Sequence, residues 1–245
     1  MIPAGKVLQA MAALPLGTLA DITGDRPVLI MAPHADDESL GCGGLIAASC
    51  RAGASPLVLV LTDGTGSHPG SAAFPPTRLA QIRQDEAREA VRLLGLPPDR
   101  IHFAGQRDTA APTGGPAFDA AVDDVSALCT ASGIGTLLAP WRHDPHCDHE
   151  AADLLAQAVA GRLFLRHLSY PVWGWTLPAD HPLPEMPDGF RLDIRRDLAA
   201  KTRAITAHQS QYGSLITDDP TGFTLPAELL RIFERPYETF LVPGQ

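Results

Sequence analysis

Two apolar runs of strand length constrain the fold of this chain more than any other feature of its sequence. They lie at residues 26–32 and 56–62, and the second reads "PLVLVLT". A run with apolar side chains on both faces is typical of a strand buried between two layers in a parallel sheet. The stretches that follow these runs read as helices, so the sequence predicts an α/β protein.

The alternation of strands and helices continues along the chain. We expect further strands at residues 100–104, 135–141, 167–173 and 239–242, and helices at 39–52, 77–94, 117–132, from about 148, at 195–209 and from 225. Neither an internal repeat nor a long linker interrupts them. The sequence therefore predicts a single Rossmann-like domain over residues 1–245, with a mostly parallel sheet and helices on both faces. Its core spans about 24–211, and residues 212–245 form a C-terminal extension.

Charge and cysteine content narrow the classes of partner. The formal net charge of -9 disfavours a protein that binds nucleic acid or an anionic membrane surface, because both reward clustered Lys and Arg. The four cysteines form no CxxC pair, so we expect no disulfide framework and a reduced, cytoplasmic setting. The N-terminal stretch resembles neither a signal peptide nor a membrane span. Small molecules are the expected partners.

Histidines and carboxylates gather directly after two of the predicted strands. The residues concerned are His34, Asp36, Asp37 and Glu38 in the first cluster, and His143, Asp144, His146, Asp148 and His149 in the second. In open parallel sheets, ligands bind outside the carboxyl ends of strands that flank the switch point. We therefore expect the two clusters to meet and form a site at the carboxyl ends of the strands.

The spacing of these side chains favours a metal site. Adjacent carboxylates repel one another unless a cation lies between them, and two histidines with one carboxylate and a water form a common catalytic zinc site. His34 and Asp37 lie on the turn after a strand and can reach one ion, and His149 can supply the third ligand. The alternative is that Asp36, Asp37 or Ser39 only caps the following helix.

The remaining polar side chains of the clusters suggest a hydrolase. Asp36 stands beside the predicted ligands, and a carboxylate in that position is what a zinc hydrolase needs as general base. His146, three residues before His149, is placed to donate a proton to a leaving amine or to stabilise an oxyanion. Asp148 is placed to hold the His146 imidazole in the required tautomer.

A glycine cluster offers a different interpretation. Gly41, Gly43 and Gly44 follow the first strand, and Asp63 ends the second strand about 20 residues later, as in a dinucleotide-binding oxidoreductase. The acidic residues of the first cluster would occupy the turn that a pyrophosphate must approach. We therefore interpret the glycines as positions where a helix packs closely on a strand.

Several motifs carry a family resemblance. The stretches "PHADDE" followed by "GCGG", and "HCDHEAA", resemble the PIG-L/LmbE-like family of zinc-dependent N-acetyl-sugar deacetylases. The similarity extends through "VLTDG", "LLG" and "AHQSQ", and covers about residues 24–211. Ala35 and Cys147 stand where the family has proline, and neither side chain is needed as a ligand.

The resemblance implies an activity and a set of site residues. His34, Asp37 and His149 would bind zinc, or another divalent ion such as Fe²⁺, with Asp36 as base and His146 oriented by Asp148. The reaction would remove the acetyl group from an N-acetylglucosamine-type amino sugar or glycoconjugate precursor, releasing acetate and a free amine. The resemblance also implies a homo-oligomer. The alternatives are a metal-dependent amidase for a different N-acyl substrate, and a dinucleotide-binding oxidoreductase or noncatalytic binding module.

Residues on the predicted loops are candidates for substrate binding. Arg83 holds a family-like position, whereas Arg107 and Asp108 are candidates from loop placement alone. The alternative is that each is a solvated surface charge. Three tryptophans at strand ends, Trp141, Trp173 and Trp175, either stack on a sugar ring or pack in the core.

Overall fold

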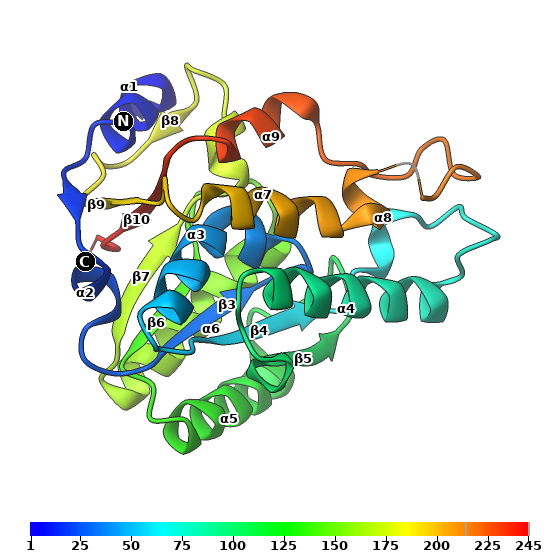
Figure 1. Cartoon of the computed structure of the whole chain (residues 1–245), viewed down its shortest axis with the longest axis horizontal. Coiled ribbons are helices and arrows are strands. Elements are labelled where there is room, and N and C mark those ends of the chain that lie inside the picture. Colours follow the sequence, from blue (N-terminus) through cyan, green and yellow to red (C-terminus); the bar gives the residue numbers. More distant parts are fainter. Residues whose placement is uncertain (214, 245) are drawn as a thin grey trace.

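The computed structural model describes residues 1–213 and 215–244. An eight-stranded sheet forms the centre of these residues (Figure 1). Its strand order is β2 (Leu16–Gly17), β9 (Gly189–Asp193), β10 (Tyr237–Leu241), β7 (Arg166–Tyr170), β6 (Thr136–Pro140), β3 (Val28–Ala32), β4 (Leu57–Thr62) and β5 (Ile101–Gln106). The strands from β7 to β5 run parallel, and β10 runs antiparallel to both of its neighbours. The predicted Rossmann-like α/β class is confirmed.

Helices cover both faces of the sheet. One face carries α3 (Asp37–Arg51), α4 (Pro76–Leu93), α7 (Leu198–Ala207) and α9 (Ala227–Phe233), and the other carries α5 (Gly115–Ala131) and α6 (Cys147–Leu163). Strand β3 shows why its sequence is apolar throughout: Ile30 points into the first layer, and Leu29 and Met31 point into the second. Within the described residues, no helix is both long and apolar enough to cross a bilayer.

The glycines of α3 let this helix approach the sheet closely. A Cβ atom on Gly41 would lie 2.2 Å from Cδ2 of Tyr170, and one on Gly44 would lie 2.4 Å from Cγ2 of Ile194. Contacts that short exclude any side chain at these two positions. The predicted role of the glycines in close packing is confirmed at both.

The N-terminal elements and the antiparallel edge were not predicted. They comprise β1 (Ile2–Pro3), α1 (Ala4–Met11), β2, α2 (Leu19–Thr23), β8 (Pro182–Leu183) and β9. Strands of two residues carry no readable periodicity and exist only through their pairing. Helix α2 did offer a local signal, because Thr18 and Asp21 form a capping box at its start.

The C-terminal part departs from the expected boundaries. The helix expected at 195–209 is divided at His208 into α7 and α8 (Gln209–Tyr212), and the strand expected to reach Trp173 ends at Tyr170. Residues after 211, expected to be an extension, include β10, which lies between β9 and β7. Residue 211 is therefore no structural boundary, and the extent of the domain stays a prediction.

Candidate functional site

Both clusters of histidines and carboxylates lie at one edge of the sheet. Strand β3 pairs in parallel with β6, with Ile30 opposite Leu138, so the loops after these strands leave the sheet side by side. The first loop leads into α3 and the second into α6. Both clusters contribute to the lining of one cavity of about 200 Å³. The predicted meeting of the two clusters at the carboxyl ends of the strands is confirmed.

Asp37 lies between two imidazole rings. Its Oδ2 is 3.3 Å from Nδ1 of His34 and 3.3 Å from Nε2 of His149. Two ligand atoms of a tetrahedral ion bound at about 2.1 Å are separated by about 3.4 Å. His146 is also close, because His34, His146 and His149 each offer an atom within 4.8 Å of the others. The donor atoms therefore have the spacing of a metal-binding set.

His149 is held through one ring nitrogen and faces Asp37 with the other. Its Nδ1 lies 3.0 Å from Oδ2 of Asp144, and the Asp144 carboxylate also accepts hydrogen bonds from the amides of residues 172–174. Among the described residues, nothing forms a hydrogen bond with the buried Nε2 of His149. Asp37 Oδ2 lies 3.3 Å from this nitrogen, and although burial lowers the pKa of His149, Asp37 and Asp144 raise it to about 9, so the surroundings favour a cation, a proton or a metal ion, at Nε2. This arrangement fits a metal ligand.

His34 is bordered by two further carboxylates. Its Nε2 lies 3.1 Å from Oδ2 of Asp148 and 3.3 Å from Oδ1 of Asp108. Burial lowers the pKa of His34, but Asp108, Asp148 and Asp37 together raise it well above its ordinary value. The two carboxylates favour a proton on Nε2. The raised pKa favours a second proton on Nδ1 beside Asp37, and a metal ion bound there would replace that proton.

Asp36 lies in the cavity wall with an unusual backbone conformation. Its φ is 154° and its ψ is -29°, a region that residues other than glycine rarely adopt. Burial raises the pKa of its carboxyl to about 6, although Arg83, 3.5 Å away, opposes this shift. Asp36 occupies the N-cap position of α3 but makes no side-chain capping bond. The capping alternative therefore does not account for Asp36.

His146 is oriented by a backbone amide and not by the Asp148 carboxylate. Its Nδ1 accepts a hydrogen bond of 3.2 Å from the amide of Asp148, at the start of α6. The Asp148 carboxylate instead accepts bonds from the amides of Thr109 and Ala111, at 2.7 and 3.1 Å. The expectation that this carboxylate holds His146 is corrected, because the loop before α5 draws it toward His34. Acceptance at Nδ1 leaves the His146 proton on Nε2.

A comparison with protein-family models shows which family this chain belongs to. The model of the PIG-L family, described as GlcNAc-PI de-N-acetylase, matches residues 29–160, which is more than half of the chain. The chain belongs to the PIG-L family. No curated protein sequence matches it significantly.

Solved structures share the fold of this PIG-L chain. N,N'-diacetylchitobiose deacetylase from Pyrococcus horikoshii is 22% identical, with a TM-score of 0.68 over 98% of this chain and 91% of that one. The conserved protein TT1542 from Thermus thermophilus is 25% identical, with a TM-score of 0.64 over 89% and 95%. The zinc inhibited form of teicoplanin deacetylase Orf2 is 17% identical, with a TM-score of 0.60 over 74% and 83%.

Of the three residues that this PIG-L chain was predicted to use for substrate binding, two line the cavity and one does not. Arg83 lines the cavity but is only 3% exposed, and its guanidinium donates to the carbonyls of Gly64 and Ala35, each at 3.0 Å. Asp108 also lines the cavity and accepts from the amide of Gly66 at 2.8 Å. Arg107 is exposed and does not line the cavity. Neither Arg83 nor Asp108 is a solvated surface charge.

The sequence did not reveal the wall that the C-terminal part contributes. Trp173, Gln211, Phe223 and Leu225 line the cavity opposite the strand-end loops, and all four lie outside the stretch matched by the PIG-L model. The Phe223 amide donates to the carbonyl of Ser67 at 2.7 Å, and the Leu225 amide donates to that of Gln211 at 2.8 Å. Trp173 was a candidate for stacking, whereas Trp141 and Trp175 pack in a separate apolar cluster beneath α1. The "AHQSQ" motif was the local signal for this wall.

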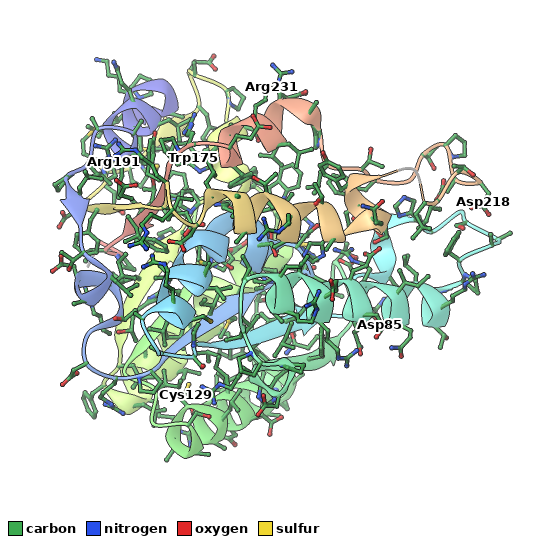
Figure 2. All side chains as sticks on the ribbon, in the orientation of Figure 1. Asp85, Cys129, Trp175, Arg191, Asp218 and Arg231 are labelled. Atoms are coloured by element: carbon green, nitrogen blue, oxygen red, sulfur yellow. The ribbon has the colours of Figure 1, made fainter. Side chains whose placement is uncertain are left out.

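The loop before α4 and the segment before α9 project from the same side of the molecule (Figure 1). Hydrogen bonds join the loop before α4 to the segment before α9. The Asp218 carboxylate accepts hydrogen bonds from the Ser71 hydroxyl at 2.7 Å and from the Ala73 amide at 2.8 Å. Asp219 accepts a bond from the amide of Gly70 at 2.8 Å. Figure 2 shows Asp218 at this junction. Two segments far apart in sequence are thus joined by hydrogen bonds to two aspartate side chains.

Proposed function

We propose that this protein is a metal-dependent hydrolase that removes the acetyl group from an N-acetylglucosamine-type amino sugar or glycoconjugate precursor. The observation that carries the proposal is the convergence of His34, Asp37 and His149: the buried Nε2 of His149 makes no hydrogen bond among the described residues and lies 3.3 Å from Asp37 Oδ2, with Asp36 in the same cavity. Membership of the PIG-L family supports the substrate class. So do the names of two proteins with the same fold, a diacetylchitobiose deacetylase and a teicoplanin deacetylase. The products are acetate and a free amine.

His34, Asp37 and His149 would hold the metal ion. Two imidazoles and a carboxylate suit zinc, and they also accept Fe²⁺ and other divalent ions. When bound, the ion supplies Lewis acidity, which polarises the acetyl carbonyl and lowers the pKa of water. Asp144 keeps the His149 ring in the tautomer whose Nε2 is available to the ion.

Asp36 is the general base of the proposed reaction. With a pKa of about 6, its carboxyl group is largely ionised at pH 7 yet basic enough to accept a proton. It takes the proton of the water that attacks the acetyl carbon. Arg83, 3.5 Å from the carboxylate, orients this group and limits its repulsion from Asp37.

His146 stabilises the negative charge that develops on the acetyl oxygen. Because its Nδ1 accepts the amide hydrogen of Asp148, its Nε2 carries the proton. That N–H donates to the carbonyl oxygen as negative charge develops, and the proton that Asp36 has taken from the water passes to the leaving amine. Asp148 contributes through its backbone amide, and its carboxylate stabilises His34 instead.

The walls of the cavity would position the sugar. Arg83 and Asp108 are the proposed polar contacts for sugar hydroxyls, from the strand-end side of the cavity. Arg107 is exposed, so it would contact only a substrate that extends beyond the cavity. Trp173 and Phe223 form an edge-to-face pair with centroids 5.7 Å apart, which offers an apolar surface to the ring face of a sugar.

The proposal is tested by measuring acetate and primary amine released from N-acetylglucosamine and an alkyl N-acetylglucosaminide. We expect equal amounts of both products, loss of release after chelation, and recovery with added Zn²⁺. A panel of other N-acyl amines is assayed in parallel. Metal-dependent hydrolysis confined to that panel would replace the proposal by the alternative amidase. Tight binding of a dinucleotide without metal-dependent hydrolysis would favour an oxidoreductase.

A further inference from the structure

The strained backbone of Asp36 needs an external restraint. A residue other than glycine at φ 154° and ψ -29° stores on the order of 1–3 kcal/mol of strain. This conformation directs the Asp36 side chain into the cavity wall, beside Arg83. Strain of this kind persists only where surrounding contacts fix it. The contacts around the Asp36 backbone therefore bear on the position of the proposed base.

Glu38 holds the amide of Asp36. Its Oε2 accepts the Asp36 N–H at 3.0 Å, and the same N–H also donates to the carbonyl of His34 at 3.1 Å, so Glu38 provides the side-chain half of a shared hydrogen bond. Its Oε1 accepts the Ser39 hydroxyl at 2.6 Å and lies 3.0 Å from Nε2 of His208. Glu38 is fully buried and does not line the cavity. Both carboxylate oxygens are thus engaged by the protein, and neither is offered to a substrate.

His208 anchors Glu38 from a distant part of the chain. It lies where α7 ends and α8 begins, it is fully buried, and it too is outside the cavity lining. Its Nε2 lies 3.0 Å from Glu38 Oε1 and 3.3 Å from the Ser39 hydroxyl. The ring does not line the cavity, so its hydrogen bonds act on the site through Glu38 and Ser39, and its charge in addition lowers the pKa of Asp36.

We propose that His208 and Glu38 are positioning residues that hold the Asp36 backbone in its strained conformation and so aim the general base. The inference rests on the proposed function, because it takes Asp36 as the base. Hydrogen bonds run in series from the His208 ring to the Glu38 carboxylate and from there to the Asp36 amide. If His208 served only to join α7 to α8, its loss would change stability without a selective effect on the step that Asp36 performs.

The test compares His208→Leu with His208→Gln, whose side-chain amide retains an N–H donor for Glu38. We expect His208→Leu to lower kcat about 10-fold or more, because small displacements of a catalytic group are costly. KM and the bound metal should stay within about twofold of wild type, as expected for an effect on the chemical step alone. His208→Gln should recover most of kcat. His167→Leu, on β7, is the matched control and should leave kcat unchanged.

A double-mutant cycle with Asp36→Ala separates positioning from general structure. If His208 acts through Asp36, adding His208→Leu to Asp36→Ala should cause no further loss of the residual activity. An equal loss in both backgrounds would overturn the inference, as would an unchanged kcat in His208→Leu with only a lower melting temperature. Should His208→Leu not fold, Glu38→Gln replaces it in the same cycle with the same expectations.

A crystal structure of His208→Leu judges the inference independently of activity. We expect the φ of Asp36 to leave the positive region and its carboxylate to move away from Arg83. An unchanged Asp36 would overturn the inference. If wild-type protein releases no amine from any N-acetyl sugar, the proposed function fails, and this structural readout still decides whether His208 and Glu38 restrain Asp36.

Discussion

Two buried ionic clusters contact helix α3, and they differ in how their charges are satisfied. At its N-terminal turn lie the residues of the candidate site. Further along, the carboxylate of Glu238 accepts bonds from the amides of Gly44 and Leu45, at 2.7 and 2.8 Å, and from Nζ of Lys201 at 2.6 Å. This Glu238 cluster pairs one carboxylate with one ammonium and two amides, all supplied by the chain itself.

The candidate site shows the opposite balance. Asp37, Asp108 and Asp148 crowd around His34, and Nε2 of His149 is buried without a hydrogen-bond partner among the described residues. Buried carboxylates in excess of cations destabilise a fold unless an added cation offsets them. The contrast teaches that burial of charge alone does not mark a functional site. A functional site is indicated instead by a set of donor atoms that the hydrogen bonds and cations of the chain do not fully satisfy.

The largest effect that distinguishes the two clusters is expected from Asp36→Ala. Loss of the proposed base should lower kcat by about 10² to 10⁴-fold, while the proposed ligands His34, Asp37 and His149 should still bind metal. Steady-state amine release and elemental analysis of the same sample measure both quantities. Undiminished activity at equal metal content would remove Asp36 from the role of base.

Breaking the Glu238 cluster should affect stability and not chemistry. Lys201→Met leaves the Glu238 carboxylate buried without its ammonium, which should cost about 3–5 kcal/mol of unfolding free energy. Urea denaturation measures this loss, and kcat of the folded fraction should stay unchanged. The double variant with Glu238→Gln should recover part of the stability. A loss below about 1 kcal/mol would show that the pair is not the structural counterpart of the site.

A third buried ionic pair, Asp153 and His167, belongs to neither cluster. Asp153 Oδ1 lies 4.0 Å from His167 Nε2, and among the described residues neither atom has a hydrogen-bond partner. Burial raises the pKa of Asp153 from 3.8 to about 6. The folded protein therefore keeps a proton that the unfolded chain loses, so this stabilising contribution is present below pH 3.8 and is lost as the pH rises through 6.

Asp153→Asn removes that pH dependence. The stability of the variant relative to wild type should rise by about 2 kcal/mol between pH 4 and pH 7.5, since one pKa unit corresponds to about 1.4 kcal/mol. Urea denaturation at both pH values gives the change, with His167→Leu as a control that keeps the carboxyl group. A relative stability that is constant over this range would contradict the raised pKa.

The parallel half of the sheet and the meeting of the two clusters could be predicted because they follow from local patterns. Apolar runs identify β3 and β4, and the order of strands and helices places the polar loops at one edge. The wall formed by Phe223 and Leu225 could not be predicted, since it depends on backbone contacts such as that of Phe223 with Ser67, far apart in sequence. The orientation of Asp148 was mispredicted for the same reason: the amides that attract its carboxylate belong to another loop.

The restraint on Asp36 also lay beyond sequence reasoning. Glu38 and His208 were visible as residues of motifs, but their contact joins positions 170 residues apart and involves a backbone conformation that no residue preference indicates. The extent of the domain, the catalytic roles and the substrate contacts stay predictions.

Metal content tests the central claim most directly. Wild-type protein and His149→Ala are purified without added metal and examined by elemental analysis, before and after incubation with Zn²⁺. We predict about one divalent ion per wild-type chain and far less in the variant, because His149 supplies one of the three proposed ligands. Wild-type protein that is free of metal and cannot be loaded, or equal metal in both proteins, would contradict the assignment of this site.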